Sequence, residues 1–324
     1  MIEQLRRSND RDTFLGVFPG ESERLRTLRA FNSWLECPLD VVTTFIRTDV
    51  PASYRQEFVH QYLTAVADTG LVPIVTWEPF GFPSTSSDAP VQSINNGSVD
   101  EHLYAWGALL RAWVLESPDR GLIFRPAHEM NGAWYPWSAG YGTTPTEYIR
   151  MWRTLSAVFD DVGLPSDRVD WMWCINATDA TRTSSFDYFP GEEYVDWVGV
   201  DGYNFGDSQR WSSWQSPATV FKQALTTVRN ETRTPIAIPE TGCSSAYNGH
   251  RSPRRKSRWI RRALALFSRY GVDLLGWFNM TKETDWGVLE PVSADASTHR
   301  ERVVLNERRY NVYPQFRNAR AQFR

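Results

Sequence analysis

The sequence predicts an α/β protein with a (β/α)8 (TIM) barrel that forms a single domain over residues 1–324, with residues 1–12 as an N-terminal extension. Eight short apolar runs have the length of buried strands, and helical patterns separate most of them. No Gly-x-Gly-x-x-Gly follows the first run, and no Gly-Lys-Ser/Thr motif occurs. The alternative, an open doubly wound sheet, therefore lacks its usual phosphate site.

The expected strands are nearly continuous apolar runs, which is typical of parallel strands that are covered on both faces. They lie at residues 14–18, 41–46, 73–77, 121–129, 169–176, 194–204, 235–240 and 272–279. Eight is the number of parallel strands at which such a sheet closes into a barrel.

The expected helices place apolar residues at steps of three and four, at residues 58–66, 103–113, 148–159, 221–228 and 260–267. Ser98 and Thr144 each precede a glutamate by three residues, which predicts a capping box at both positions. Ser216 before a proline predicts a simpler cap. The connection at 178–191 lacks a helical pattern, and we expect only a short turn of helix there.

Composition excludes several classes of partner. Lysine and arginine number 35 against 38 acidic residues, a net charge of -3 that argues against nucleic acid. No apolar run reaches the length of a membrane span or a signal peptide, so no membrane partner is expected. Cys37, Cys174 and Cys243 are an odd number without paired spacing, which predicts neither a disulfide framework nor a zinc site.

Two glutamates end predicted strands, and the catalytic groups of a barrel project from the carboxyl ends of its strands. The apolar run 122–124 leads into a polar cluster that contains Glu129, and the run before Glu240 ends in the same way. Glycoside hydrolysis uses one protonated and one ionised carboxyl group, about 5 Å apart in retaining enzymes. Glu129 and Glu240 fit this pair. The alternative is that each is a solvated residue or part of a structural ion pair.

The segment 125–137 contains the motif Arg-Pro-x-His-Glu-Met-Asn-Gly-x-Trp and resembles the acid/base motif of glycoside hydrolase family 26. The resemblance extends over essentially the whole chain through residues 196–204 and 239–242. It implies a retaining (β/α)8 glycosidase in which Glu129 is the general acid/base and Glu240 the nucleophile. No cofactor is required by this mechanism.

Aromatic and amide side chains near the predicted strand ends are candidate sugar contacts, because an indole covers the apolar face of a pyranose and amides bind its hydroxyls. Tyr203 is expected to donate a hydrogen bond to Glu240, and His128 to orient Glu129 or to bind sugar. The alternative for each is a packed core role. The full set is His128, Trp134, Trp137, Tyr203, Trp277, Trp286, Asn131, Asn204 and Trp77.

A metal-dependent hydrolase is the competing enzyme class, and the sequence gives it little support. Only five histidines occur, with no His-x-His and no His-Glu-x-x-His motif, so we expect no metal. The basic run 251–256 precedes the last predicted helix, and we expect it to be a solvated helix entrance rather than an anion site.

The resemblance implies an endo-acting enzyme on plant or algal polysaccharide, with β-1,4-mannan as the main substrate. Tyr135 and Pro136 replace a more aromatic run typical of the mannanases, which raises mixed-linkage β-1,3-1,4-glucan and β-1,3-xylan as alternatives. An alternative of another class is a carbohydrate-binding pseudoenzyme without turnover. A monomer is expected, and secretion is expected from the substrate class although the chain shows no signal peptide.

Overall fold

A computed structural model describes residues 13–82, 89–292 and 301–323. The extension expected at residues 1–12 lies outside the described residues. Contacts divide the described chain into two compact units. Unit 1 comprises residues 44–199 and 231–235, and unit 2 comprises residues 13–43, 200–230 and 236–323. The prediction that the whole chain forms one domain stays a prediction.

Unit 1 alternates strands with helices. It begins within one strand, β2, and ends within another, β6, and the rest of each of these strands belongs to unit 2. Its elements are the second half of β2 (Val41–Arg47), α3 (Ala52–Glu57), η1 (Phe58–Leu63), α4 (Thr64–Ala67), β3 (Val72–Glu78), α5 (Pro90–Asn95), α6 (Asp100–Leu115), β4 (Leu122–Pro126), η2 (Ala139–Tyr141), α7 (Pro145–Asp161), β5 (Val169–Asn176), η3 (Ser185–Tyr188), η4 (Glu192–Tyr194) and the start of β6 (Trp197–Asn204).

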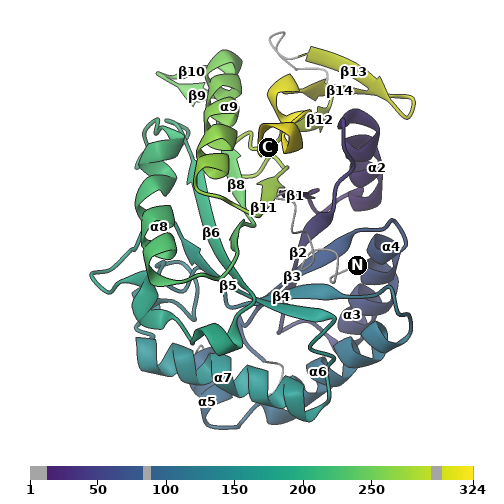
Figure 1. Cartoon of the computed structure of the whole chain (residues 1–324), viewed down its shortest axis with the longest axis vertical. Helices are drawn as coiled ribbons and strands as arrows, with labels where there is room; N and C mark the ends of the chain where they lie inside the picture. Colours follow the sequence, from purple (N-terminus) through teal and green to yellow (C-terminus); the bar gives the residue numbers. More distant parts are fainter. Residues whose placement is uncertain (1–12, 83–88, 293–300, 324) are drawn as a thin grey trace. The chain divides into compact units, whose positions relative to one another are not determined.

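The core of unit 1 is the parallel sheet β3–β4–β5. The buried residues of β4 lie beside those of β3 and β5, with Ile123 in register with Ile74 and Asp170. Helices α6 and α7 pack closely against each other (Figure 1). The absence of a side chain at Gly107 of α6 allows this, since a Cβ atom there would lie 2.8 Å from Val162, the residue that follows α7. In this arrangement β3, β4 and β5 end at the same edge of the sheet, and their carboxyl ends position the polar segments that follow them.

Unit 2 holds the remaining elements of the described chain. They are β1 (Phe14–Phe18), α2 (Arg24–Trp34), the first half of β2, the end of β6, α8 (Pro217–Glu231), β7 (Ile236–Ile238), β8 (Thr241–Cys243), β9 (Ala246–Tyr247), β10 (His250–Arg251), α9 (Pro253–Arg269), β11 (Leu274–Phe278), β12 (Leu289–Pro291), β13 (Glu301–Leu305), β14 (Arg308–Val312), η5 (Pro314–Phe316) and η6 (Arg320–Phe323).

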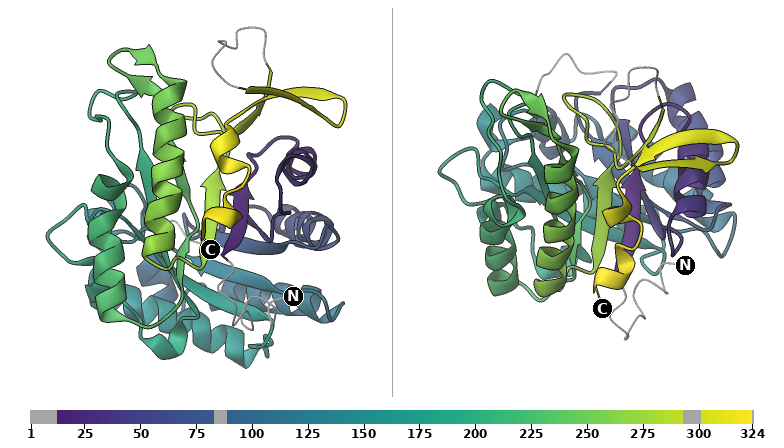
Figure 2. Two further views of the ribbon diagram at one scale, coloured as in Figure 1. Left: turned by 45° about the horizontal axis from the view of Figure 1, so that its top comes forward. Right: turned by 90° about the horizontal axis from the view of Figure 1, so that it is seen from above.

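Within unit 2 the strands run in the order β2–β1–β11–β7–β6–β8, and the pairs β1–β11, β11–β7 and β6–β8 are parallel. Helices α8 and α9 lie side by side, with an edge-on contact between Phe221 and Phe267 at 4.9 Å. The antiparallel hairpin β13–β14 reaches α2 (Figure 2), where Arg308 pairs with Glu23 at 2.6 Å. The sheet β12–β14–β13 was not predicted from the sequence.

All eight predicted runs contain a strand, and five predicted helical segments are helical. The Thr144 capping box is confirmed, because Thr144 accepts from the Glu147 backbone and Glu147 accepts in return. The Ser98 capping box is wrong: α6 begins at Asp100, and the Ser98 hydroxyl donates to the Ser93 carbonyl instead. The turn expected at 178–191 is the 3-10 helix η3.

None of the helices in the described chain is both long enough and apolar enough to cross a bilayer.

Candidate active site

Strand β4 ends at Pro126, three residues earlier than predicted, and a strained turn carries Glu129. Ala127 has a φ of 46° and Glu129 a φ of 53°, in the left-handed region that residues other than glycine rarely adopt. The backbone N–H of Ala127 donates to the Trp77 carbonyl at 2.9 Å, and that of Glu129 to Cys174 at 2.8 Å. Strain of this kind collects at functional sites. The turn takes Glu129 out of the alternating pattern of the strand.

Neutral donors hold both carboxylate oxygens of Glu129, which is buried. The Asn176 amide donates to Oε1 at 2.8 Å, and the Trp134 indole N–H donates to Oε2 at 2.7 Å. Two donors on two oxygens fix the plane of a carboxylate as well as its position. Glu129 is therefore a buried carboxyl group in a fixed position rather than a solvated residue at the end of a strand.

Asn131 acts on Glu129 through Asn176. Its Oδ1 accepts from the Asn176 N–H, and its Nδ2 donates to the Asn176 carbonyl and to Asp179, each at 2.8 Å. The Asn131 side chain is buried and its hydrogen-bonding groups are engaged by protein. Asn131 thus holds Asn176 in place, and its predicted contact with sugar stays a prediction. Asn176 was missed as a site residue, although its place at the end of the fifth strand was a signal.

Trp134 is the open indole of unit 1, with 46% of its surface exposed. Its ring folds back over Gly132, where a side chain would meet the ring at 2.7 Å, so only glycine fits. One edge of the ring is fixed by the hydrogen bond to Glu129. An exposed indole face thus lies directly beside a buried carboxylate, which suits a sugar ring whose glycosidic oxygen approaches Glu129.

Trp137 and Trp77 are both buried, and their predicted contacts with sugar stay a prediction. Trp137 is buried, stacks on Tyr135 with ring centroids 4.4 Å apart, and donates its N–H to the His128 carbonyl at 2.7 Å. Trp77 is equally buried and packs on two phenylalanine rings. Both indoles are part of the packed support under the turn that holds Glu129.

His128 is buried beside Arg125, a guanidinium that is itself fully buried. Burial and the Arg125 charge hold the pKa of His128 well below its ordinary range, so the imidazole is neutral at pH 7. Arg125 donates through Nε and Nη2 to the Thr76 hydroxyl at 2.8 and 2.6 Å. The neutral imidazole of His128 packs against the rings of Tyr135 and Trp137, with centroids 4.8 and 6.1 Å away.

In unit 2, Glu240 follows β7 and lies buried between β7 and β8. The Tyr203 hydroxyl donates to Glu240 Oε2 at 2.7 Å, which confirms the predicted hydrogen bond. The register of β6 against β8 brings this about, since Tyr203 pairs with Gly242, two residues after Glu240. The position of the nucleophile candidate is thus set by pairing between neighbouring parallel strands.

Trp286 is buried and packs against Tyr203, and its predicted stacking on sugar stays a prediction. Its ring lies 5.0 Å from that of Tyr203 and 4.8 Å from that of Phe205. Gly242 makes room, because a side chain there would lie 3.0 Å from Trp286 and 3.2 Å from Tyr203. Trp286 therefore keeps the phenol in place to hold Glu240.

Trp277 and Asn204 are also buried among protein groups, and their predicted contacts with sugar stay a prediction. Trp277 is buried, packs on Trp259 and Phe316, and donates its N–H to the Trp286 carbonyl at 3.0 Å. Asn204 is buried, and its Oδ1 accepts from two backbone N–H groups of the following loop, at 3.1 and 2.9 Å. Both positions were identified correctly as strand ends, but their polar groups bind the protein itself.

Trp211 is an aromatic residue that the sequence analysis missed, and 73% of its surface is exposed. It lies in the loop after β6 and contacts Phe205 edge-on at 4.8 Å. The loop is held by Gln209, whose amide donates to the Glu283 carbonyl at 3.1 Å. Because Phe205 also contacts Trp286, a continuous set of rings leads from the Glu240 partner Tyr203 to an exposed indole.

Lys256 corrects the expectation that the run 251–256 is solvated, because its side chain is fully buried. Its ammonium donates to the carbonyls of Asp285 and of Gly287, the latter at 2.9 Å, and lies 4.8 Å from the Tyr313 ring. These two carbonyls flank Trp286 in sequence. The cation therefore fixes the loop that supports Tyr203.

We expect Lys256→Met to lower the free energy of unfolding by roughly 2 to 4 kcal/mol, because two buried carbonyls lose their donor. Urea denaturation of purified variants measures this change. Arg254→Met is the matched control on the same helix, where an exposed side chain should cost less than about 0.5 kcal/mol. Equal stability of the two variants would show that the Lys256 contacts contribute nothing.

The chain is similar to a known protein family and to several known proteins. Residues 112–248 match the family model described as glycosyl hydrolase family 26. Endoglucanase H of Acetivibrio thermocellus is 31% identical over 282 residues, 85% of this chain and 28% of the relative. A mannan endo-1,4-beta-mannosidase of Bacillus subtilis is 31% identical over 124 residues, 38% of this chain and 31% of the relative. The chain thus spans under a third of the length of these relatives.

Among solved structures, the catalytic domain of the Bacillus sp. JAMB-750 GH26 endo-beta-1,4-mannanase has a TM-score of 0.65 at 20% identity and covers 88% of this chain and 82% of that chain. The GH26 beta-mannanase BoMan26A of Bacteroides ovatus has a TM-score of 0.61 at 17% identity, with 88% and 87% covered. At such identities the likeness shows the fold, and the predicted (β/α)8 barrel is confirmed.

Proposed function

Because the chain belongs to glycosyl hydrolase family 26, as its motifs suggested, we propose that it hydrolyses β-linked polysaccharide with retention of anomeric configuration. One observation carries the proposal. Two buried glutamates follow the fourth and seventh strands of a (β/α)8 barrel, and each is held by hydrogen-bond donors of its own unit. Glycoside hydrolysis by two carboxyl groups needs this preorganisation.

In the first step, Glu240 attacks the anomeric carbon and forms a glycosyl ester as the bond to the leaving oxygen breaks. Glu129 gives its proton to that oxygen, and the indole N–H of Trp134 and the amide of Asn176 remain to bind the carboxylate that results. Proton loss from Glu129 thus produces an anion whose two donors are already in place.

In the second step, Glu129 takes a proton from water, whose oxygen attacks the same anomeric carbon and displaces Glu240. The Tyr203 hydroxyl stabilises the carboxylate that leaves, as it stabilises the free nucleophile before attack. Two inversions at one carbon give net retention. Apart from the attacking water, both steps use only the side chains of the protein.

The main substrate that we propose is β-1,4-mannan, cleaved within the chain by a monomeric enzyme. Names of several relatives and of the solved structures support it, since they are endo-1,4-β-mannanases. Trp134 and Trp211 are the proposed stacking platforms, because they are the indoles with open faces in their respective units. His128 is proposed to orient the turn that carries Glu129.

A second candidate substrate is a β-glucan, and one observation favours it. The match to Endoglucanase H runs over 85% of the chain, whereas the match to the Bacillus subtilis mannosidase runs over 38%. Substrate choice in this fold depends on loops between strands, so a match that includes more of them carries more weight.

Incubation with mannan, barley β-glucan and β-1,3-xylan tests the proposal. We expect oligosaccharide products from mannan or β-glucan, and proton NMR at early times should show the β-anomer of the new reducing end. Initial release of the α-anomer would contradict a double displacement. Binding of polysaccharide without any cleavage would instead favour the non-catalytic alternative.

We expect Tyr203→Phe to lower kcat about ten- to hundredfold with little change in KM, because one hydrogen bond to a charged group is lost. Steady-state kinetics on the preferred polysaccharide measure this. Tyr270→Phe is the matched control, since it removes a phenol that contacts Thr226 on the outer helices. Unchanged kcat in Tyr203→Phe would remove this residue from the proposed mechanism.

A further inference from the structure

Helix α9 of unit 2 concentrates positive charge on its outer side. Its 17 residues include six arginines and one lysine and no acidic residue. At about 100° per residue, the exposed arginines fall within an arc of about 100°, opposite the buried apolar residues of the helix. The net charge of -3 of the whole chain conceals this concentration. We call the row the arginine stripe, and it consists of Arg254, Arg258, Arg261, Arg262 and Arg269.

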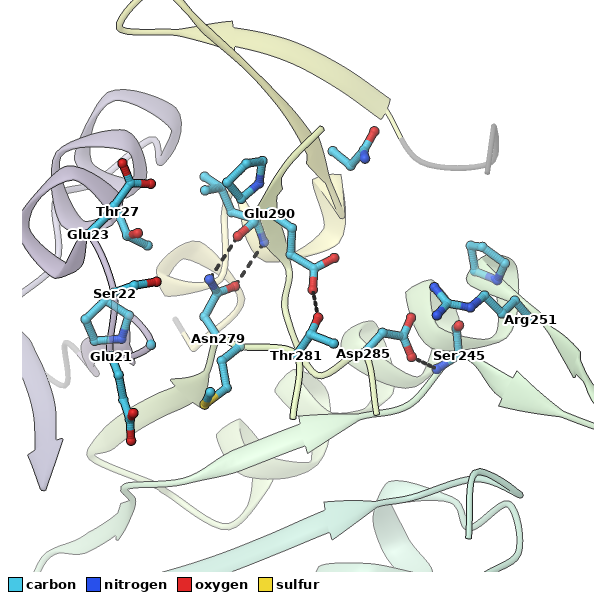
Figure 3. Close-up of a pocket in the computed structure, with 17 residues that line it drawn as sticks. Glu21, Ser22, Glu23, Thr27, Ser245, Arg251, Asn279, Thr281, Asp285 and Glu290 are labelled. Atoms are coloured by element: carbon cyan, nitrogen blue, oxygen red, sulfur yellow. Dashed lines mark hydrogen bonds between the residues drawn. The ribbon is translucent and has the colours of Figure 1, made fainter. Parts of the chain in front are cut away.

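The arginine stripe is not neutralised by the protein itself. No carboxylate in the described part of the chain forms an ion pair with it. The neighbouring helix α8 presents the exposed cation Lys222, and its one carboxylate, Glu231, is its last residue. Asp285, which Figure 3 shows beside Ser245, accepts from the Ser245 backbone N–H at 2.8 Å and not from the stripe. The charge of the stripe therefore faces solvent.

This arrangement is unfavourable for the helix as such. Like charges four residues apart repel each other, as Arg254 does Arg258 and Arg258 does Arg262. Arg254 also lies in the first turn, where the helix dipole disfavours a cation. Positions that break a local rule without a compensating contact in the fold are expected to have a role outside it. The stripe thus indicates counter-charges that another molecule supplies.

The surroundings of the stripe disfavour several classes of anionic partner. The large exposed apolar side chains of the described residues, such as Trp134 and Trp211, lie outside α8 and α9. A helix on a membrane surface inserts apolar side chains, and a stable protein partner buries an apolar core. Single-stranded nucleic acid stacks its bases on aromatic rings. A linear polymer that carries a charge on each unit, without apolar parts, needs none of these groups.

We propose that the arginine stripe binds a linear acidic polysaccharide built of uronic acids. The stripe is about 22 Å long, from Arg254 to Arg269, and its side chains follow one another at about 5 to 6 Å. Successive carboxylates of one extended chain can therefore pair with successive guanidinium groups, each through two parallel N–H bonds. The attachment goes beyond the proposed hydrolysis and does not depend on it.

Affinity electrophoresis of the whole chain in gels that contain polygalacturonate tests this. We expect retardation, and none in gels with fully methyl-esterified polygalacturonate, which has the same backbone without the charge. Combining Arg258→Gln, Arg261→Gln and Arg262→Gln should weaken binding about ten- to hundredfold.

The matched control removes the same charge from exposed positions outside α9, by combining Arg150→Gln, Arg182→Gln and Arg233→Gln. It should bind polygalacturonate as the unaltered chain does. Thermal denaturation of the stripe variant should show an equal or higher Tm, because repulsion between like charges is removed. Its hydrolysis of neutral β-glycan should be unchanged. A loss of binding then reports on the stripe and not on folding.

Several results would overturn the inference while the proposed function stands. These are equal retardation by the esterified polymer, equal weakening in the control variant, and binding that persists in about 1 M salt, where charges are screened beyond about 3 Å. Tighter binding of duplex DNA or of phosphatidylserine vesicles than of polygalacturonate would likewise exclude an acidic polysaccharide as the partner of this helix.

Discussion

Glu240→Ala is expected to lower polysaccharide turnover by a factor of roughly 10⁴ or more, since the attacking group itself is removed. The fold should persist, because the substitution leaves the backbone pairing of β7 with β11 and of β8 with β6 in place. Reducing-sugar release measures turnover, and circular dichroism measures folding. Glu193→Ala, at an exposed glutamate, is the matched control and should keep normal activity.

The same variant gives a diagnostic reaction with azide. A substrate with a good leaving group should react with azide on the face that the missing carboxylate exposes, and the product should be the α-glycosyl azide. One inversion instead of two accounts for the changed configuration. Near-normal hydrolysis by Glu240→Ala would exclude Glu240 as nucleophile, as would formation of the β-glycosyl azide.

Glu129→Ala is expected to lower hydrolysis of polysaccharide by about 10²- to 10⁴-fold, because no group protonates the leaving oxygen. Substrates with acidic leaving groups, such as dinitrophenyl glycosides, need no such proton, so their first step should be much less affected. The glycosyl-enzyme on Glu240 should then accumulate, since no base activates water. Intact-mass measurement during turnover detects this ester.

Azide again separates the roles. In Glu129→Ala it should attack the glycosyl-enzyme and give the β-glycosyl azide, the opposite anomer from the Glu240 variant. Asn176→Ala is an informative companion, because it removes one donor to Glu129 and leaves the carboxyl group in place. We expect it to retain more activity than Glu129→Ala. Equal loss on both substrate types in Glu129→Ala would contradict its role as acid.

The strained turn at Ala127 and Glu129 explains why the fourth strand was predicted to be too long. The predicted strand was extended to Glu129 through a polar cluster, and residue pattern alone gives no sign of a positive φ at alanine or glutamate. The turn exists because backbone hydrogen bonds to Trp77 and Cys174, on the two neighbouring strands, hold it. Those partners are distant in sequence, so the strain was invisible locally.

The tryptophans also show what sequence position does not predict, which is whether a ring is exposed. Position at a strand end predicted a sugar platform equally for Trp134, Trp137 and Trp277, yet only the first is exposed. Whether both faces of a ring are covered depends on side chains from other elements, such as Phe316 against Trp277. Trp211 was missed for the reverse reason, because nothing in its own loop sequence showed that it would stay open.

The sequence by itself determined the eight strands, the helices between them, the Thr144 capping box and the two glutamates that follow the fourth and seventh strands. These features depend on residue periodicity and on chemistry within a few positions. Only the tertiary structure decided that Asn176 holds Glu129, that Lys256 is buried, and which indoles are open. Burial and partnering are properties of residues that meet only after folding, and local pattern does not encode them.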